Sequence, residues 1–300
     1  MKKWLQRCTV IIASAAILLG GITPAGAAPE LNWVEGAGQA IDIGEGLASF
    51  TLQEGMIFLN GKDAQTFITE TGGKPSGEEI GAVLPAAEDA TWGVFIEYTD
   101  SGHIKDDEKD KIDADELLQS YKDGTEAANK ELDPSAHLFV DSWDIEPAYN
   151  EKTKRLTWSL LAHNSSNEKI VNYNERLLTR EGYISIVLVS NPEHLAADRV
   201  EMEKTVLSSF KVKEGKRYED FDKSTDKVAE YGLTGLVLGG AGLAVAKKVG
   251  FLALILGLFK KFWIVVVAVL AGLWRLITGK KKKDETTVPP SGDDTPQSLT

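Results

Sequence analysis

Cysteine and histidine are scarce in this 300-residue chain. The single cysteine, Cys8, lies in an N-terminal segment that we expect to be removed, so the mature chain would have no thiol. This excludes disulfide bonds, thiolate zinc sites and a cysteine nucleophile. No histidine belongs to an HExxH or HxH pairing, and we expect each to be a packed or surface imidazole: His103, His137, His163 and His194.

Two common functional patterns are also missing. No serine lies in a G-x-S-x-G turn, and no glycine-rich loop matches a phosphate cradle. The templates of serine hydrolases and nucleotide-binding proteins therefore fail, and we expect no cofactor.

The net charge of −12 is unevenly distributed. Residues 28–230 carry a net charge of −20, whereas the two ends together carry +8. Because the acidic middle would be repelled by a phosphate backbone, nucleic acid is not expected as a partner.

The N-terminus has the pattern of a signal peptide. Three basic residues within the first seven precede the uncharged stretch Thr9–Ile22, which is short for a membrane span. Ala25-Gly26-Ala27 then offers the small residues that signal peptidase recognises. We expect residues 1–27 to be removed and the mature chain to begin near Ala28 or Pro29.

The C-terminal part contains three apolar runs separated by paired lysines: Tyr231–Ala246, Val249–Phe259 and Phe262–Trp274. Lys280–Lys283 follow, and a basic flank beside an apolar helix is typical of the cytoplasmic side. We predict a transmembrane helical module at 223–278 and a lysine-rich, then disordered, tail at 279–300. The main domain would be extracytoplasmic and anchored in the cell membrane.

The number of membrane crossings stays open. One arrangement crosses at Tyr231–Ala246 and lays the later runs in the inner interface. Another makes Tyr231–Ala246 and Phe262–Ile277 two spans, which would leave the lysine tail outside. An odd number agrees better with an exported domain and a basic tail. A buried, non-membrane hairpin is less favoured, because paired lysines that bound apolar blocks suit a membrane.

Small residues recur in the first apolar run. Gly235 and Gly239 lie four residues apart, on one face of a helix, and Gly242 and Ala246 continue the small residues. Because glycine lets two backbones approach closely, this pattern predicts self-association or pairing with a membrane-protein partner. The alternative is that these glycines serve flexibility or lipid contact.

Residues 28–222 are predicted to form an α+β domain, an antiparallel sheet with flanking helices. Strand patterns occur at Ala40–Ile43, Ala48–Leu52, Met56–Leu59, Thr91–Tyr98, Leu138–Trp143, Leu156–Ala162, Lys169–Leu178 and Tyr183–Val189. Helices are expected at Asp63–Thr71, Asp113–Leu132 and Leu195–Phe210. The order sheet, helix, meander, helix resembles that of the PsbP/Mog1-like sandwich.

The densest acidic cluster is a candidate metal site. Asp106, Glu108 and Asp110 alternate as in a calcium loop, but the central glycine and the terminal bidentate glutamate are missing. The alternative is a solvated loop that precedes the next helix.

Polar residues also interrupt one strand pattern. Alternation along 169–178 divides its side chains between two faces: Asn172, Asn174 and Arg176 on one, Val171, Tyr173 and Glu175 on the other. The first set could line a ligand groove, although a sheet face open to water gives the same pattern.

Several runs resemble one known family: Ser101–Asp107, Leu156–Trp158, Val171–Asn174, Leu178–Gly182, Gly215–Phe221 and Asp226–Gly232. They are similar to runs of the domain of unknown function 2167 family, a family of predicted membrane-anchored bacterial proteins. The resemblance covers nearly the whole mature chain. It implies an anchored envelope protein, and it supplies no catalytic residues.

Two classes of function remain. The anchor and the missing catalytic motifs favour a non-enzymatic binding, sensing or scaffold module for a membrane partner. In this interpretation the stretch Gly215–Tyr218 is a linker that contacts lipid headgroups. The alternative is a carboxylate-dependent cell-envelope hydrolase or transferase, which only the abundance of acidic residues supports.

Overall fold

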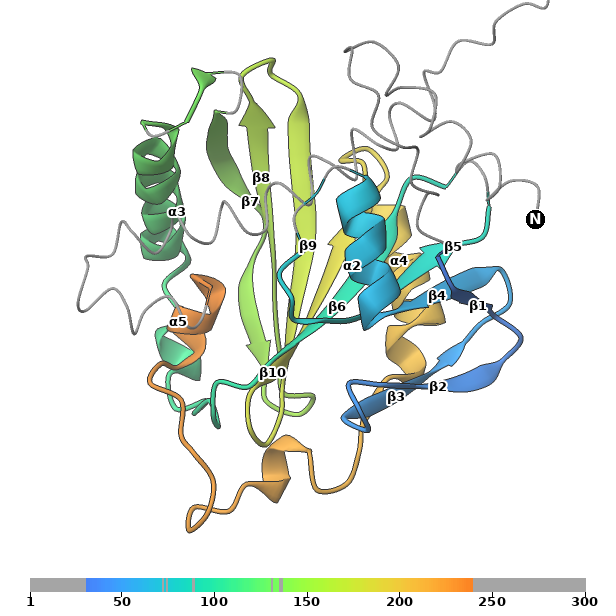
Figure 1. Ribbon diagram of the computed structural model, residues 1–300. Helices are drawn as coiled ribbons and strands as arrows, with labels where there is room; N and C mark the ends of the chain where they lie inside the picture. The colour runs from blue at the N-terminus through green and yellow to red at the C-terminus, as the bar shows by residue number, and fades with distance from the viewer. Residues whose placement is uncertain are drawn as a thin grey trace, which may run out of the picture.

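The computed structural model describes residues 31–239, except for residues 72, 74, 88, 89, 131, 135 and 136. Its centre is an eight-stranded antiparallel sheet in the order β1-β4-β5-β6-β10-β9-β8-β7 (Figure 1). The strands are β1 Trp33–Glu35, β4 Met56–Asn60, β5 Glu79–Pro85, β6 Gly93–Thr99, β7 Leu138–Asn150, β8 Arg155–Asn164, β9 Lys169–Leu178 and β10 Tyr183–Val189. The middle strands carry apolar side chains on both faces, so each face needs its own covering layer.

A small sheet and a helix cover the back face. The small sheet has the order β11-β3-β2, and the helix is α4: β11 Lys211–Val212, β3 Ala48–Leu52, β2 Gln39–Ile43 and α4 Leu195–Thr205. Phe50 of the small sheet and Met202 of α4 belong to one buried cluster with Ile184 and Ile186 of β10. In Figure 1, α4 lies behind the large sheet.

Three helices cover the front face: α2 Gly61–Glu70, α3 Ala114–Asn129 and α5 Leu233–Val237. Helix α2 buries Ile68 against Phe95 and Val187. Helices α3 and α5 lie together on another part of the sheet, where Leu117 and Leu236 pack in a cluster with Trp158 (Figure 1). The front layer therefore has two separate parts.

The α+β class and the antiparallel sheet with flanking helices are confirmed. β9 and β10 have the predicted bounds, and the predicted helix at Asp113–Leu132 is α3. Helix α3 begins where expected because Asp113 caps it, accepting the Glu116 N–H at 3.0 Å. β7 runs past its predicted end to Asn150, through Pro147, which an edge strand tolerates.

Residues 213–239, here called the C-terminal strap, pack along the domain. The domain was predicted to end at residue 222, but Leu233 and Leu236 have no exposed surface. The start of the apolar run therefore completes the core of this domain. No helix within the described residues is long and apolar enough to span a bilayer. The predicted signal peptide and the apolar residues after Gly239 lie outside the described residues.

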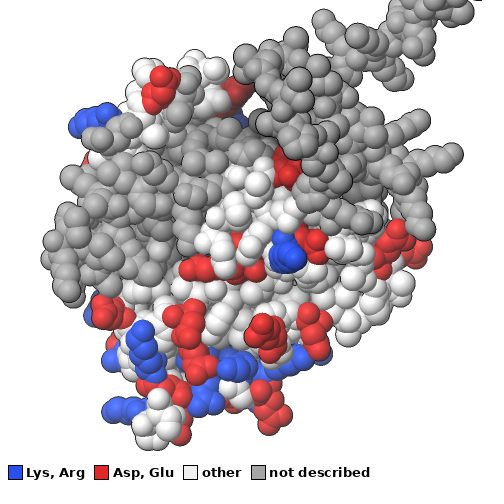
Figure 2. Space-filling model, viewed as in Figure 1, with Lys and Arg blue, Asp and Glu red and all other residues white. Residues whose placement is uncertain are grey.

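The strap also joins the domain through charged groups. Figure 2 shows basic and acidic side chains interspersed over the lower end of the molecule, where the strap runs in Figure 1. Arg180 pairs with Asp226 at 2.7 Å, and Lys216 pairs with Glu181 at 2.9 Å. The alternation of signs thus reflects contacts between the strap and the turn after β9.

Candidate functional site

Strand β9 presents polar side chains to grooves on both faces of the sheet. On the front, Asn172, Asn174 and Arg176 line a narrow groove of about 120 Å³. On the back, Tyr173 and Glu175 line a wider groove of about 790 Å³. The alternation read from the sequence thus places two polar sets in two different grooves.

The front groove combines apolar walls with the polar residues of β9. Leu160 and Ala162 of β8 and Ile170 of β9 line it from the sheet. Val237 and Leu238, at the end of α5, line it from the strap. The groove is therefore bounded partly by the sheet and partly by the end of the strap, within the apolar run Tyr231–Ala246.

Arg176 is 5 % exposed although it carries a full charge. Its guanidinium carbon lies 5.0 Å from the ring centre of Trp158 and 5.9 Å from that of Tyr183. Its Nη1 donates to the backbone carbonyl of Glu175 at 3.2 Å. Two aromatic faces and a carbonyl thus hold the charge in place.

A buried carboxylate stands in the same row of the sheet. Arg176 is paired across the strands with Ser185, and Ser185 with Glu97, so all three side chains point to the front. Burial raises the pKa of Glu97, while the hydrogen bond from Ser76 and the charge of Arg176 oppose that rise. The Ser76 hydroxyl donates to Glu97 Oε1 at 2.6 Å.

Asn172 has a buried acceptor atom without a hydrogen-bond donor at the front groove. Its Oδ1 is buried and has no hydrogen-bond partner among the described residues. Its neighbour Asn174 donates from Nδ2 to the Asn172 backbone carbonyl at 3.3 Å. A buried acceptor without a donor costs free energy, so the groove favours a ligand that brings an N–H or O–H group.

The wall on the strap side is fixed by a hydrogen bond. The Tyr121 hydroxyl of α3 donates to the backbone carbonyl of Val237 at 2.6 Å. Tyr121 also meets Trp143 edge-on, with ring centres 5.7 Å apart. Helix α3 thus sets the position of the strap beside the groove.

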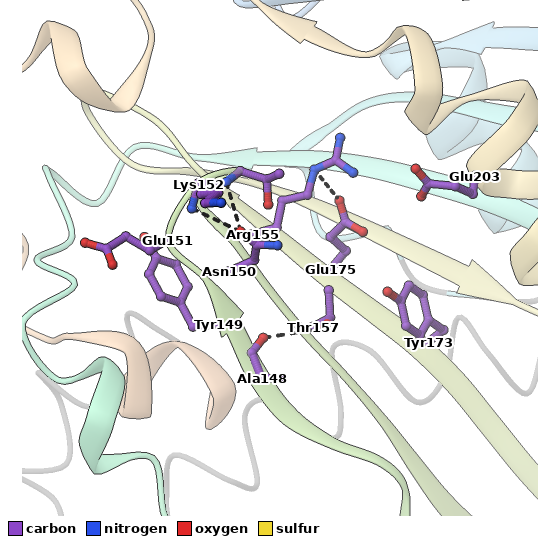
Figure 3. Close-up of a pocket in the computed structure, with 11 residues that line it drawn as sticks. Ala148, Tyr149, Asn150, Glu151, Lys152, Arg155, Thr157, Tyr173, Glu175 and Glu203 are labelled. Atoms are coloured by element: carbon purple, nitrogen blue, oxygen red, sulfur yellow. Dashed lines mark hydrogen bonds and ion pairs between the residues drawn. The ribbon is translucent and has the colours of Figure 1, made fainter.

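The back groove lies between the β7–β8 hairpin, β9 and α4. Figure 3 shows Arg155 reaching toward Glu175, with Tyr173 and Glu203 farther along. Arg155 Nε lies 3.1 Å from Glu175 Oε1, and Glu175 is 2 % exposed. Burial raises the pKa of the Glu175 carboxyl to about 7; Arg155 opposes this rise, and the charge of Glu203 adds to it. Glu175 can therefore change its charge near neutral pH.

Below the sheet, several runs that carry the family resemblance meet in space. The His103 ring is stacked between Tyr218 and Phe221, with centres 4.3 Å and 3.9 Å away. Arg180 binds both carboxylate oxygens of Asp226, at 2.7 Å and 2.8 Å. Burial lowers the pKa of His103. This cluster fastens the strap to the domain.

The sequence model of a family described as "Protein of unknown function (DUF2167)" matches residues 35–271. The chain belongs to the DUF2167 family. None of the curated proteins matches it. Among solved structures it is similar to cyanobacterial PsbP (CyanoP) from Synechocystis sp. PCC 6803, with 12 % sequence identity and a TM-score of 0.35, covering 65 % of this chain and 99 % of that one.

In the DUF2167 protein the stretch Gly215–Tyr218 packs on the domain. The Tyr218 hydroxyl donates to the Ile104 carbonyl at 3.0 Å, and Arg217 forms a β-bridge with Thr179. The stretch is therefore part of the folded domain, and its contact with lipid headgroups stays a prediction.

The predicted metal residues do not converge in the DUF2167 domain. Asp106 accepts from Lys154 Nζ at 3.0 Å, Glu108 accepts from the Thr234 backbone N–H at 3.4 Å, and Asp110 is exposed. No three histidine, cysteine or acidic side chains within the described residues are grouped to hold a metal ion. Each carboxylate points to its own partner or to solvent, so the calcium-like spacing makes no cage here.

Gly235 and Gly239 do not share a helical face in this structure. Gly235 is buried inside the five-residue helix α5. Gly239 lies beyond the helix with a φ of +103°. Pairing of these glycines in a membrane stays a prediction, and it would require the strap to leave the domain.

Sequence reasoning missed the residues that complete the DUF2167 grooves. Arg155 and Glu203 come from β8 and α4, and only the folded sheet brings them to Glu175. The bond from Tyr121 to Val237 joins positions 116 residues apart. No local pattern signals such contacts.

Proposed function

We propose that this DUF2167 protein is a membrane-anchored, extracytoplasmic binding module without enzymatic activity. Its front groove would receive an apolar side chain, with the adjoining backbone, from a protein partner in the same membrane. The signal-like N-terminus and the apolar C-terminal runs support the location.

The size of the front groove supports a protein partner. At about 120 Å³ it has room for a few heavy atoms, well below the roughly 300–1,000 Å³ of small-molecule sites. Binding energy at protein interfaces is concentrated in a few anchor side chains that fill such pockets.

The polar groups of the front groove favour a ligand that brings a backbone N–H group together with its apolar anchor side chain. The buried Oδ1 of Asn172 lacks a donor and can accept from a peptide N–H, and Arg176, four residues along the same strand, is already held by two rings. A purely apolar ligand would leave the Asn172 oxygen without a donor.

One observation carries the proposal: Val237, Leu238 and Gly239 line the front groove. The rest of this apolar run, up to Ala246, follows directly in the sequence, and the apolar runs Val249–Phe259 and Phe262–Trp274 come after it. A partner in the same membrane would therefore have the groove beside it. Because the strap forms one wall, occupation of the groove would also be linked to the position of α5.

A photo-crosslinking amino acid at Leu160 tests the proposal in cells that produce the full chain. We expect one discrete adduct in the membrane fraction, and its loss when Ala162→Trp fills the groove. The matched control places the same amino acid at Val200, which is 65 % exposed on α4. Identical adducts from both positions, or none from Leu160, would overturn the proposal.

A further inference from the structure

The back groove is a second site, independent of the front groove and of the function proposed for it. It has a volume of about 790 Å³, within the range of small-molecule sites. Its charged groups are separated in space: Lys152 and Arg155 come from the β7–β8 hairpin, and Glu203 comes from α4. Figure 3 shows Tyr173 on the α4 side of the groove, with Glu203.

The hairpin side offers unused donors. Arg155 contacts Glu175 through Nε, and its two terminal nitrogens form no hydrogen bond with the described residues. Within the described part of the chain, neither Arg155 nor Lys152 pairs with another carboxylate. A guanidinium with both terminal nitrogens available can bind a carboxylate in bidentate fashion.

The α4 side offers unused negative charge. Glu203 lies close enough to Glu175 for its charge to raise the pKa of that group. Glu203 is exposed, and it forms no ion pair with a described residue. Lys204 pairs instead with Glu201, at 3.3 Å, and Arg199 lies over the Tyr173 ring at 5.4 Å. An ammonium group beside Glu203 would offset this charge.

From this layout we infer that the back groove binds a zwitterionic ligand with a free ammonium group and a free carboxylate, such as an amino acid or a short peptide. Glu203, which is exposed, receives the ammonium group, and Arg155 and Lys152 receive the carboxylate.

The balance of charges among the lining residues favours a ligand with a carboxylate over one with a phosphate. The lining residues include three carboxylates, of Glu151, Glu175 and Glu203, and two cations. Lys109 pairs with Glu151 at 2.7 Å, which leaves two carboxylates and two cations in the groove. A ligand with one charge of each sign matches this balance better than a doubly charged phosphate.

Calorimetry on the purified full-length chain tests this inference with defined probes. Glycine and triglycine carry both charges, N-acetyl-triglycine lacks the ammonium group, and triglycine amide lacks the carboxylate. We expect triglycine to bind at least tenfold more tightly than either blocked form. Glu203→Gln should weaken triglycine binding at least fivefold and leave N-acetyl-triglycine binding unchanged.

Glu201→Gln is the matched control, because it removes a charge from the same helix outside the groove. Glu203 is exposed, so its substitution should leave folding intact. The inference is overturned if neither zwitterionic probe binds at millimolar concentration, if the blocked forms bind equally well, or if the two helix variants behave alike. None of these results bears on the front groove, which lies on the other face of the sheet.

Discussion

The hydroxyl of Tyr121 donates a hydrogen bond to the backbone carbonyl of Val237, 116 positions later in the sequence. This bond joins α3 to the last turn of α5, which lies within the apolar run Tyr231–Ala246. The same turn forms one wall of the front groove. A single side chain on α3 therefore connects the groove with the segment that we expect to enter the membrane.

Removal of this hydroxyl should loosen the strap without unfolding the domain. Tyr121→Phe keeps the ring and loses one hydrogen bond, a cost of about 1 kcal/mol. We expect a cysteine introduced at Leu238 to react faster with maleimide in this variant. Tyr149→Phe is the matched control, because its ring packs in the same cluster but its hydroxyl donates to Asp106, at 2.9 Å, and not to α5. Equal labelling in the two variants would show that Tyr121 does not hold the strap.

Close packing of the strap on Gly102 predicts that alanine substitution there costs more stability than at another glycine of positive φ, Gly38. Gly102 and Gly38 both have positive φ, +86° and +80°. A Cβ at Gly102 would lie 2.9–3.0 Å from backbone atoms of residues 227–229, whereas a Cβ at Gly38 would meet nothing within 4 Å. Gly38→Ala should cost about 1–2 kcal/mol through backbone strain, and Gly102→Ala distinctly more. Urea denaturation measures both, and equal costs would argue against the close contact.

The ion pair of the strap should affect acid stability. Hydrogen bonds from the Arg180 side chain and the Asp222 N–H hold the pKa of Asp226 well below its usual range. This stabilisation is present above the ordinary pKa near 3.8 and is lost as pH falls through the lowered value. Asp226→Asn should therefore lower the melting temperature at pH 6, and its deficit should shrink in acid.

Asp42→Asn is the control for this experiment. Asp42 of the small sheet pairs with a strap residue, Lys213, at 2.8 Å, but its side chain is exposed, whereas that of Asp226 is buried. A deficit in Asp226→Asn that stays constant with pH would contradict the account of the strap.

The raised pKa of Glu175 predicts that stability depends on pH in the opposite sense to the effect of Asp226. Its pKa of about 7 exceeds the ordinary value of 4.5, so the folded chain keeps this proton longer than the unfolded chain. That stabilisation is present at low pH and is lost as pH rises through about 7. Between pH 4.5 and 8 the wild type should lose about 1–3 kcal/mol of unfolding free energy relative to Glu175→Gln. Parallel curves for the two proteins in denaturant titrations would refute the assignment.

Much of the fold follows from local pattern. β9 and β10 were placed at their observed ends because their apolar runs are bounded by the turn Thr179–Gly182, and the alternation in β9 divided its side chains correctly between the faces. β5 was missed, because Glu79–Pro85 begins with a charged residue and ends in proline. The strap was missed for a different reason: an uncharged run reads the same whether lipid or a protein core covers it.

The two grooves were less predictable than the strands. Asn172, Asn174 and Arg176 follow from the period of one strand. Arg155 and Glu203 lie 20 and 28 residues from Glu175 on other elements, and their contacts depend on strand register and on the position of α4. For the acidic run at 106–110, spacing could not decide between a metal site and a solvated loop, because spacing alone does not show that Asp106 binds Lys154.

Labelling of a single cysteine tests most directly whether a partner occupies the front groove. The chain has no cysteine other than Cys8, so Asn174→Cys in a Cys8→Ser background reports only on the groove. Val200→Cys is the control on the exposed side of α4. We predict that maleimide labels the Asn174 position slowly in intact membranes and quickly in the purified full-length protein, while the Val200 position reacts equally in both. Equal reactivity of the Asn174 position in membranes and in purified protein would contradict the account.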